Sequence, residues 1–168
     1  MFEINNYSRQ RVIKLAVIIF IGCFIVLCFA SFDMIKSRMR DTERRSDIKT
    51  LAKALELYHD KYDRYPDSVD DGQGWDLSTN EKNGVPDFLT VLKTEGFINR
   101  TVSDPVNDIF YNYRYRKYAA GELGCQTSFY ILQISGFESP AEDNGRGECP
   151  EFDWTQTNQN GYTIQGFD

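Results

Sequence analysis

The sequence has few of the residues on which catalytic sites depend. Its 168 residues include a single histidine, His59, whose charged neighbours predict a position on the surface. One exposed histidine supports neither a Ser/His/Asp nor a Cys/His arrangement for nucleophilic catalysis. The chain also has no CxxC or HExxH motif, and no phosphate-binding glycine loop follows a predicted strand. We therefore predict no catalytic residues, and a protein that is not an enzyme.

Positive charge is scarce in the second part of the chain, although the whole chain has a net charge of only −6. Residues 1–14 hold three basic residues and one acidic residue, and residues 33–65 hold nine basic and seven acidic residues, so each stretch has a net charge of +2. Residues 66–168 therefore carry −10. A nucleic-acid-binding domain needs a basic surface, so this balance predicts no nucleic-acid partner.

Charge is absent from residues 15–32, and glycine and proline are absent from residues 33–65. The first stretch has eighteen uncharged, mostly apolar residues, which meets the usual threshold for a transmembrane helix. The second stretch favours helix up to Tyr65, where Pro66 disfavours helical geometry. We predict one long helix from Leu15 to about Asp63, with its first half in a membrane and its second half amphipathic.

The apolar run also fits a cleavable signal peptide, with basic residues before it and a small-residue cleavage site at Ala30. The length of the run and the continuation of the helix past Ala30 favour a retained anchor. Basic residues lie on both sides of the run, so the positive-inside rule does not fix its orientation. The anchor interpretation divides the chain into a cytoplasmic lead (1–14), a transmembrane segment (15–35) and an extracytoplasmic domain (36–168).

The second half of the helix carries an apolar stripe that predicts packing on a domain core. The members of this stripe lie three or four positions apart: Ile48, Leu51, Leu55, Tyr58 and Tyr62. Three further residues are expected to widen it: Ala52, Ala54 and Leu57. The opposite side is charged and is expected to face water: Arg44, Arg45, Lys49, Lys53, Glu56, Asp60 and Lys61.

The rest of the chain predicts a short helix and a small antiparallel sheet, hence an α+β fold. Residues 67–84 indicate a loop, and Pro86 opens a short helix that Gly96 ends. Strands are expected at 109–118, at 127–135 and at 161–167, with a hairpin loop at 121–126 and a loop at 136–151. The second strand is apolar on both faces, so we expect it to be central.

The first predicted strand alternates strictly between two kinds of side chain. Tyr111, Tyr113 and Tyr115 share one face, and the other face carries Asn112, Arg114 and Arg116. Interleaved tyrosines and arginines also suit nucleic acid or sugar. In a region with a net charge of −10, we expect the tyrosines to pack in the core instead.

The four cysteines fall into two pairs. Cys23 and Cys28 lie in the apolar run, whereas Cys125 and Cys149 flank a glycine-rich loop of the polar domain. A disulfide between Cys125 and Cys149 would place this domain in an oxidising compartment. Two free thiols in a cytosolic domain are the alternative, and the spacing alone does not decide between them.

Taken in order, these parts resemble the type IV pilin-like proteins and are most similar to the major pseudopilins of type II secretion systems. The order is a basic lead, an apolar helix that becomes amphipathic, a Tyr-Pro stop, an acidic loop, a short helix, an Asp-Pro turn and a tyrosine-rich hairpin. The residues that carry the likeness are 45–51, 54–58, Arg64-Tyr65-Pro66, Gly74-Trp75-Asp76, Phe88-Leu89, Gly96-Phe97-Ile98 and Asp104-Pro105-Val106-Asn107. The tyrosines Tyr111, Tyr113 and Tyr115 complete the set.

One motif of that family is missing. Its members carry a prepilin-peptidase site, a glycine followed by Phe-Thr-Leu-x-Glu, immediately before the apolar run. Here Gly22-Cys23-Phe24 lies inside the run, and no glutamate follows within five residues. The resemblance further implies a disulfide-closed C-terminal loop at Cys125–Cys149. It also implies a calcium site in a C-terminal loop, for which the weak candidates are Glu142, Asp143 and Asn144.

The resemblance implies a structural subunit of the bacterial cytoplasmic membrane, with a single span and an extracytoplasmic domain. Its partners would be the membrane, other pilin-like subunits bound through the apolar helix, and the secretion or pilus assembly machinery. The alternative is a monomeric anchored module that recognises a ligand or Ca²⁺ through loops 67–84 and 136–153. No other cofactor is expected.

Overall fold

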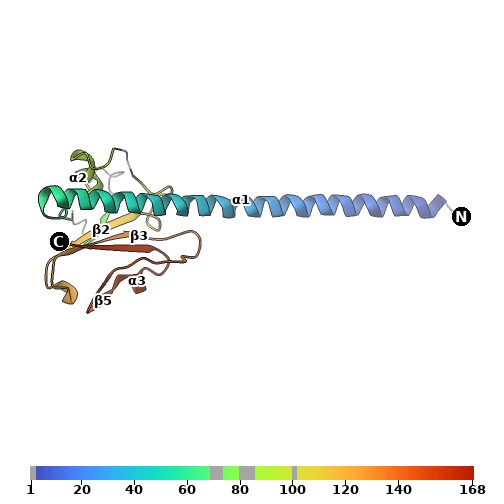
Figure 1. Ribbon diagram of the computed structural model, residues 1–168. Helices are drawn as coiled ribbons and strands as arrows, with labels where there is room; N and C mark the ends of the chain where they lie inside the picture. The colour runs from blue at the N-terminus through green and yellow to red at the C-terminus, as the bar shows by residue number, and fades with distance from the viewer. Residues whose placement is uncertain (1–2, 69–73, 80–85, 100–101) are drawn as a thin grey trace. The chain divides into compact units, whose positions relative to one another are not determined.

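The computed structural model describes residues 3–68, 74–79, 86–99 and 102–168, and it contains the predicted α+β arrangement (Figure 1). The elements in chain order are α1 (Glu3–Tyr62), β1 (Asp76–Leu77), α2 (Phe88–Thr94), β2 (Tyr113–Tyr118), the 3-10 turn η2 (Glu122–Gly124), β3 (Phe129–Ile134), β4 (Glu148–Cys149), β5 (Phe152–Asp153), α3 (Trp154–Thr157) and β6 (Tyr162–Phe167). The chain divides into two units, Met1–Met39 and Arg40–Asp168.

The first unit consists of the N-terminal part of α1. Its large apolar side chains are exposed in the described parts of the predicted membrane segment, residues 15–27 and 31–35, from Leu15 (63%) through Phe20 (73%) to Ile35 (56%). Among the described residues, α1 is the one helix long and apolar enough to cross a membrane. The helix qualifies as a possible membrane span by its length and composition, and a signal sequence near the N-terminus would qualify in the same way.

The second unit has its core between the C-terminal part of α1, α2 and the sheet. The predicted stripe is buried at Ile48, Leu51, Leu55 and Tyr58, as is Ala54. These residues contact tyrosines and aliphatic side chains of β2 and β3, whose strands lie beside this part of α1 in Figure 1. The amphipathic pattern of residues 48–58 therefore predicts the buried face of the helix correctly.

Three residues of the helix differ from the prediction. Leu57 was expected to widen the buried stripe but is 42% exposed, and Tyr62, in the last turn, is 37% exposed. Arg44 was expected to face water, yet it is completely buried. Arg44 precedes Ile48 by four residues, so helical spacing places it on the core face despite its charge.

The sheet is antiparallel with the strand order β1-β2-β3-β6, so β3 is central as predicted. All six residues of β3 are buried, and Tyr162–Phe167, within the predicted strand 161–167, form the edge strand β6. The predicted start of the first strand at Ile109 is wrong, because β2 begins at Tyr113. The Asp108 carboxylate accepts from the amides of Phe110 and Tyr111 at 2.8 Å, which turns this segment away from the strand pairing.

The two faces of the sheet belong to different clusters. Tyr113 and Tyr115 lie on the face that contacts α1, together with Tyr130 and Leu132 of β3. Arg114, Arg116 and Tyr118 of β2 alternate with these tyrosines and therefore lie on the other face. There Tyr118 packs with Phe129, Ile131, Trp154 and the cysteines 125 and 149. The tyrosines of β2 thus divide between the two clusters.

The loops contain short elements that the sequence pattern does not predict. β1 lies within the predicted loop 67–84 and pairs with β2, and β4 pairs with β5 in a separate two-stranded sheet. Strands of two residues are too short to show a periodic pattern. By contrast, α2 is predicted well: Asp87 and Thr90 form a capping box, and Gly96 follows the helix with a φ of +79°.

The burial of the helix stripe gives a matched pair of substitutions. Leu51→Ala should lower the free energy of unfolding by about 2–5 kcal/mol, because the side chain is completely buried in the core. Leu57→Ala should change it by only about 0.5 kcal/mol. Chemical denaturation of the full chain in detergent micelles, followed by circular dichroism, measures both. Equal losses would contradict this helix orientation.

Candidate functional site

A buried cluster of charges joins α1 to two loops of the second unit. Its centre is the Arg44 guanidinium, whose Nε donates to Asp104 Oδ2 at 2.6 Å and whose NH2 donates to Asp104 Oδ1 at 3.0 Å. Its NH1 donates to Asp41 Oδ1 at 2.8 Å and to Glu138 Oε1 at 2.9 Å. The two-pronged contact with Asp104 is the strong, directional form of an arginine–carboxylate pair. Arg44 therefore contacts three carboxylates from three parts of the chain.

The partners of Arg44 are themselves held in place. Asp104 Oδ1 also accepts from the amides of Val106 (2.8 Å) and Asn107 (3.2 Å), which forms the predicted Asp-Pro turn. Asp41 accepts from the amides of Glu138 (3.0 Å) and of Ser139 (2.9 Å). These bonds add backbone donors to the carboxylates, including one from Ser139 to Asp41 Oδ2, which Arg44 does not contact. A buried charge cluster requires such additional hydrogen bonds.

A second arginine closes the cluster on the side of Glu138. Arg40 Nε donates to Glu138 Oε1 at 2.6 Å, and its NH2 contacts the other carboxylate oxygen. Hydrogen bonds from Arg40 lower the pKa of Glu138 from 4.5 to about 2, with a further contribution from Arg44. Burial alone would lower the pKa of Arg44, but its bonds to Asp104 and Glu138 raise it above its ordinary value. Glu138 and the two arginines are therefore charged at neutral pH.

Next to this cluster, Tyr113 of β2 bonds to α1. The Tyr113 hydroxyl donates to Asp47 Oδ2 at 3.0 Å, and both residues are buried. Burial raises the pKa of Tyr113, and the negative charge of Asp47 raises it further. The tyrosine therefore stays neutral and donates a hydrogen bond that ties the sheet to the helix.

The predicted cysteine pair is present as a disulfide. Cys125 and Cys149 are bonded, with their Cα atoms 5.2 Å apart, and they close a loop that includes β3. Both are buried in the cluster on the sheet face opposite α1. Gln165 Nε2 of β6 lies 3.6 Å from the Cys149 sulfur. The bond fits a domain in an oxidising compartment and excludes the free-thiol alternative for this pair.

The calcium candidates lie on the segment between β3 and β4. Asp143 Oδ1 accepts from the Gly145 amide at 2.8 Å, and Asn144 Nδ2 donates to the Asn158 carbonyl at 3.3 Å. Glu142 is exposed. One of the three side chains thus bonds within its own loop, and another bonds to the segment before β6. In the part of the chain that the structure describes, no group of three or more His, Cys, Asp or Glu residues is arranged to hold a metal. Calcium binding at these residues stays a prediction.

His59 lies at the edge of the core, not in a reactive cluster. Its ring packs on Tyr65 with centroids 4.7 Å apart, and its Nε2 is 3.7 Å from Asp168 Oδ1. The side chain is a quarter exposed, which agrees with the predicted surface position.

The chain matches no protein-family model, no curated protein and no solved structure. Its function is therefore argued from the geometry described above.

Sequence reasoning did not identify the charge cluster, because it treated charged residues of the helix as exposed. The available signal was the spacing of Asp41, Arg44 and Ile48, which share one helical face. The partners Asp104 and Glu138 are separated from Arg44 by 60 and 94 residues, so no local pattern connects them.

Removing the Arg44 guanidinium should strongly lower the stability of the domain. Arg44→Met leaves the buried Asp104 carboxylate without its charge partner, so we expect a loss of about 3–5 kcal/mol in the free energy of unfolding. Lys49→Met, on an exposed position of the same helix, should change it by about 0.5 kcal/mol. Denaturant titration of both variants checks this. A stable Arg44→Met protein would show that the cluster contributes little.

The pKa of Glu138 makes part of the stability depend on pH. Because folding lowers this pKa from 4.5 to about 2, the unfolded chain binds more protons between these values. The stabilisation by Glu138 is therefore complete above pH 4.5 and is lost as the pH falls towards 2. We expect Glu138→Gln to be less stable than the native chain at pH 7, with the difference shrinking on acidification. The exposed Glu43→Gln control should show no such convergence.

Proposed function

We propose that the chain is a membrane-anchored, pilin-like structural subunit, of the kind found in type IV pili and in the pseudopili of type II secretion. It assembles through its apolar helix with other subunits of this kind. The observation that carries the proposal is the exposure of the large apolar side chains between Leu15 and Leu27, which are 47–73% exposed. Exposure of so continuous an apolar surface to water is unfavourable, so lipid or neighbouring helices must cover it.

Two features of the second unit support this proposal. The C-terminal part of α1 covers an antiparallel sheet, as the resemblance to the pilin-like proteins implies. The Cys125–Cys149 disulfide agrees with the closed C-terminal loop that the same resemblance implies, and with an extracytoplasmic domain. In this account α1 is shared between two environments: lipid or other subunits cover residues 15–35, and the sheet covers the stripe at residues 48–58.

Lateral helix packing, not chemistry, is the mechanism in this proposal. Residues 15–35 lie among the corresponding helices of neighbouring subunits, or in lipid before assembly. The secretion or pilus assembly machinery would be the further partner. The missing prepilin-peptidase site favours a subunit that keeps its N-terminal lead, since Gly22-Cys23-Phe24 lies within the apolar run.

A second candidate function is the monomeric anchored module that binds a ligand. It is favoured by one observation: Trp75, from the described part of loop 67–84, and Phe152, from loop 136–153, line the same cavity. The remainder of the first loop, residues 69–73 and 80–84, lies outside the described residues. The two functions are compatible, because the anchor and the cavity use different residues.

A charge in the middle of the apolar helix tests the anchor and the assembly together. Ile19→Lys should abolish membrane insertion or assembly, because a lysine at the centre of a transmembrane helix costs about 3 kcal/mol and disrupts lateral packing. Ile19→Leu is the matched control and should behave as the native chain does. Membrane fractionation after alkaline extraction and recovery in sheared filaments are the two measurements. Normal yields of Ile19→Lys in both fractions would contradict the proposal.

A further inference from the structure

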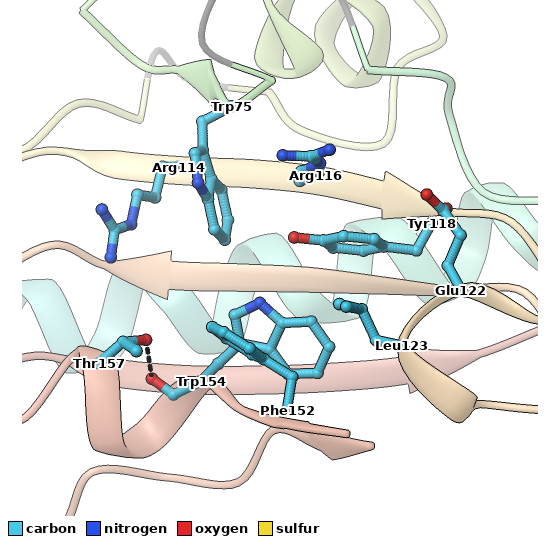
Figure 2. A pocket seen from close by; sticks show the side chains of 9 residues that line it. All are labelled: Trp75, Arg114, Arg116, Tyr118, Glu122, Leu123, Phe152, Trp154 and Thr157. Atoms are coloured by element: carbon cyan, nitrogen blue, oxygen red, sulfur yellow. Dashed lines mark hydrogen bonds between the residues drawn. The ribbon is translucent and has the colours of Figure 1, made fainter. Parts of the chain in front are cut away.

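The sheet face opposite α1 carries a cavity of about 490 Å³, a size typical of ligand pockets. Figure 2 shows side chains from loop 67–84 and from loop 136–153 gathered over the strands of the sheet. Six of the lining residues have the chemistry that matters for recognition: Trp75, Arg114, Arg116, Tyr118, Phe152 and Trp154. These two tryptophans are the only two in the sequence.

The aromatic residues form a fixed wall with exposed rings at its edge. Trp154 is buried and contacts Tyr118 and Phe152 edge to face, with ring centroids 5.4 and 4.9 Å apart. Tyr118 in turn stacks on Phe129 at 4.8 Å. Phe152 is 37% exposed, and Trp75 is partly exposed. Interlocked rings of this kind present flat apolar surfaces with little conformational freedom.

The two arginines are held in position beside these rings. The Arg114 guanidinium stacks 4.8 Å over Trp75, and its Nε donates to the buried Gln133 Oε1 at 2.7 Å. The Arg116 guanidinium stacks 4.8 Å over Tyr118. Gly74 lies directly against Arg116: a Cβ at Gly74, which has a φ of +75°, would meet Arg116 NH1 at 2.5 Å. In Figure 2 the ring of Trp75 lies between the two arginines.

Neither arginine forms an ion pair with a described residue. Among the described residues, no carboxylate lies within 4.0 Å of either guanidinium nitrogen. Burial lowers the pKa of Arg114, so a bound anion would stabilise its charged form. Glu122 also lines the cavity, and its Oε2 accepts from the Ala119 amide at 2.5 Å, which holds this side chain to the turn after β2. The cavity therefore offers two positioned cations beside flat aromatic surfaces.

We propose that this cavity binds an acidic saccharide, with a sugar ring stacked on the exposed aromatic rings and its carboxylate on Arg114 and Arg116. Arginine recognises a carboxylate through paired N–H donors, and a pyranose ring offers an apolar face of C–H groups to an aromatic ring. A neutral sugar would leave the arginines without an anion.

This inference supplies a ligand class for the anchored binding module proposed above, and it does not depend on filament assembly. Its failure would leave the Ile19→Lys experiment unaffected, since that substitution lies in the apolar helix. The two proposals can therefore be overturned separately.

Tryptophan fluorescence reads this cavity directly, because both tryptophans of the chain line it. The full chain in detergent micelles is titrated with trigalacturonate, a linear trimer of a uronic acid, and with neutral maltotriose. We expect trigalacturonate to change the emission saturably and to bind at least tenfold more tightly than maltotriose. No saturable change up to 10 mM (about the weakest binding such a titration resolves), or equal binding of the two trisaccharides, would overturn the proposal.

Substitution of one arginine tests the role assigned to its charge. Arg116→Gln should weaken trigalacturonate binding by about ten- to a hundredfold, and Arg116→Lys should lose less. Arg146→Gln, an exposed arginine outside the cavity, is the matched control and should bind as the native chain does. Unchanged binding by a folded Arg116→Gln would overturn the proposal. If that variant does not fold, the comparison of the two trisaccharides on the native chain still decides.

A peptide carboxylate is the competing ligand class. N-acetyl-Gly-Gly-Phe with a free C-terminus offers an aromatic ring and a carboxylate without a sugar. Binding of this peptide in place of trigalacturonate would overturn the saccharide assignment.

Discussion

The domain depends on one buried guanidinium. Arg44 binds Asp104 through two hydrogen bonds and also contacts Asp41 and Glu138, so it holds together the helix, the Asp-Pro turn and the segment after β3. Burial of these charges is favourable only because nearly every oxygen has a donor, including backbone amides at Asp41 and Asp104. Replacing the whole cluster, carboxylates included, by well-packed apolar side chains is often neutral or stabilising in proteins, but apolar contacts would not fix which loop meets which turn of the helix.

The same helix meets two different requirements along its length. Its first part exposes large apolar side chains at residues 12–27 and 32–35, whereas its second part buries a stripe against tyrosines of the sheet. In the proposed subunit, lipid or other helices cover the exposed apolar surface, and the sheet already covers the stripe. The proposed subunit function follows from this difference, and the cavity on the opposite sheet face uses none of the residues involved. Anchoring and recognition can therefore be separated by mutation.

Local patterns predicted the parts of the fold that local forces determine. The stripe at Ile48–Tyr58, the capped helix α2 and the apolar strand β3 were each expected from spacing and composition, and each is present. Arg44 was expected at the surface because charge usually indicates exposure, and its carboxylate partners lie far away in the sequence. The strand predicted from Ile109 starts at Tyr113, because the Asp108 side chain binds the intervening amides. The cavity combines residues from distant loops, so only the folded chain brings them together.

The most direct test of the subunit proposal is to shear native cells and measure the intact mass of this protein in the released filaments and in the membrane. The proposal predicts the protein in the filament fraction, and its mass there identifies the N-terminus that the assembled subunit carries. Its presence only in the membrane, at full length and in cells that do form filaments, would contradict assembly and leave an anchored ligand-binding module.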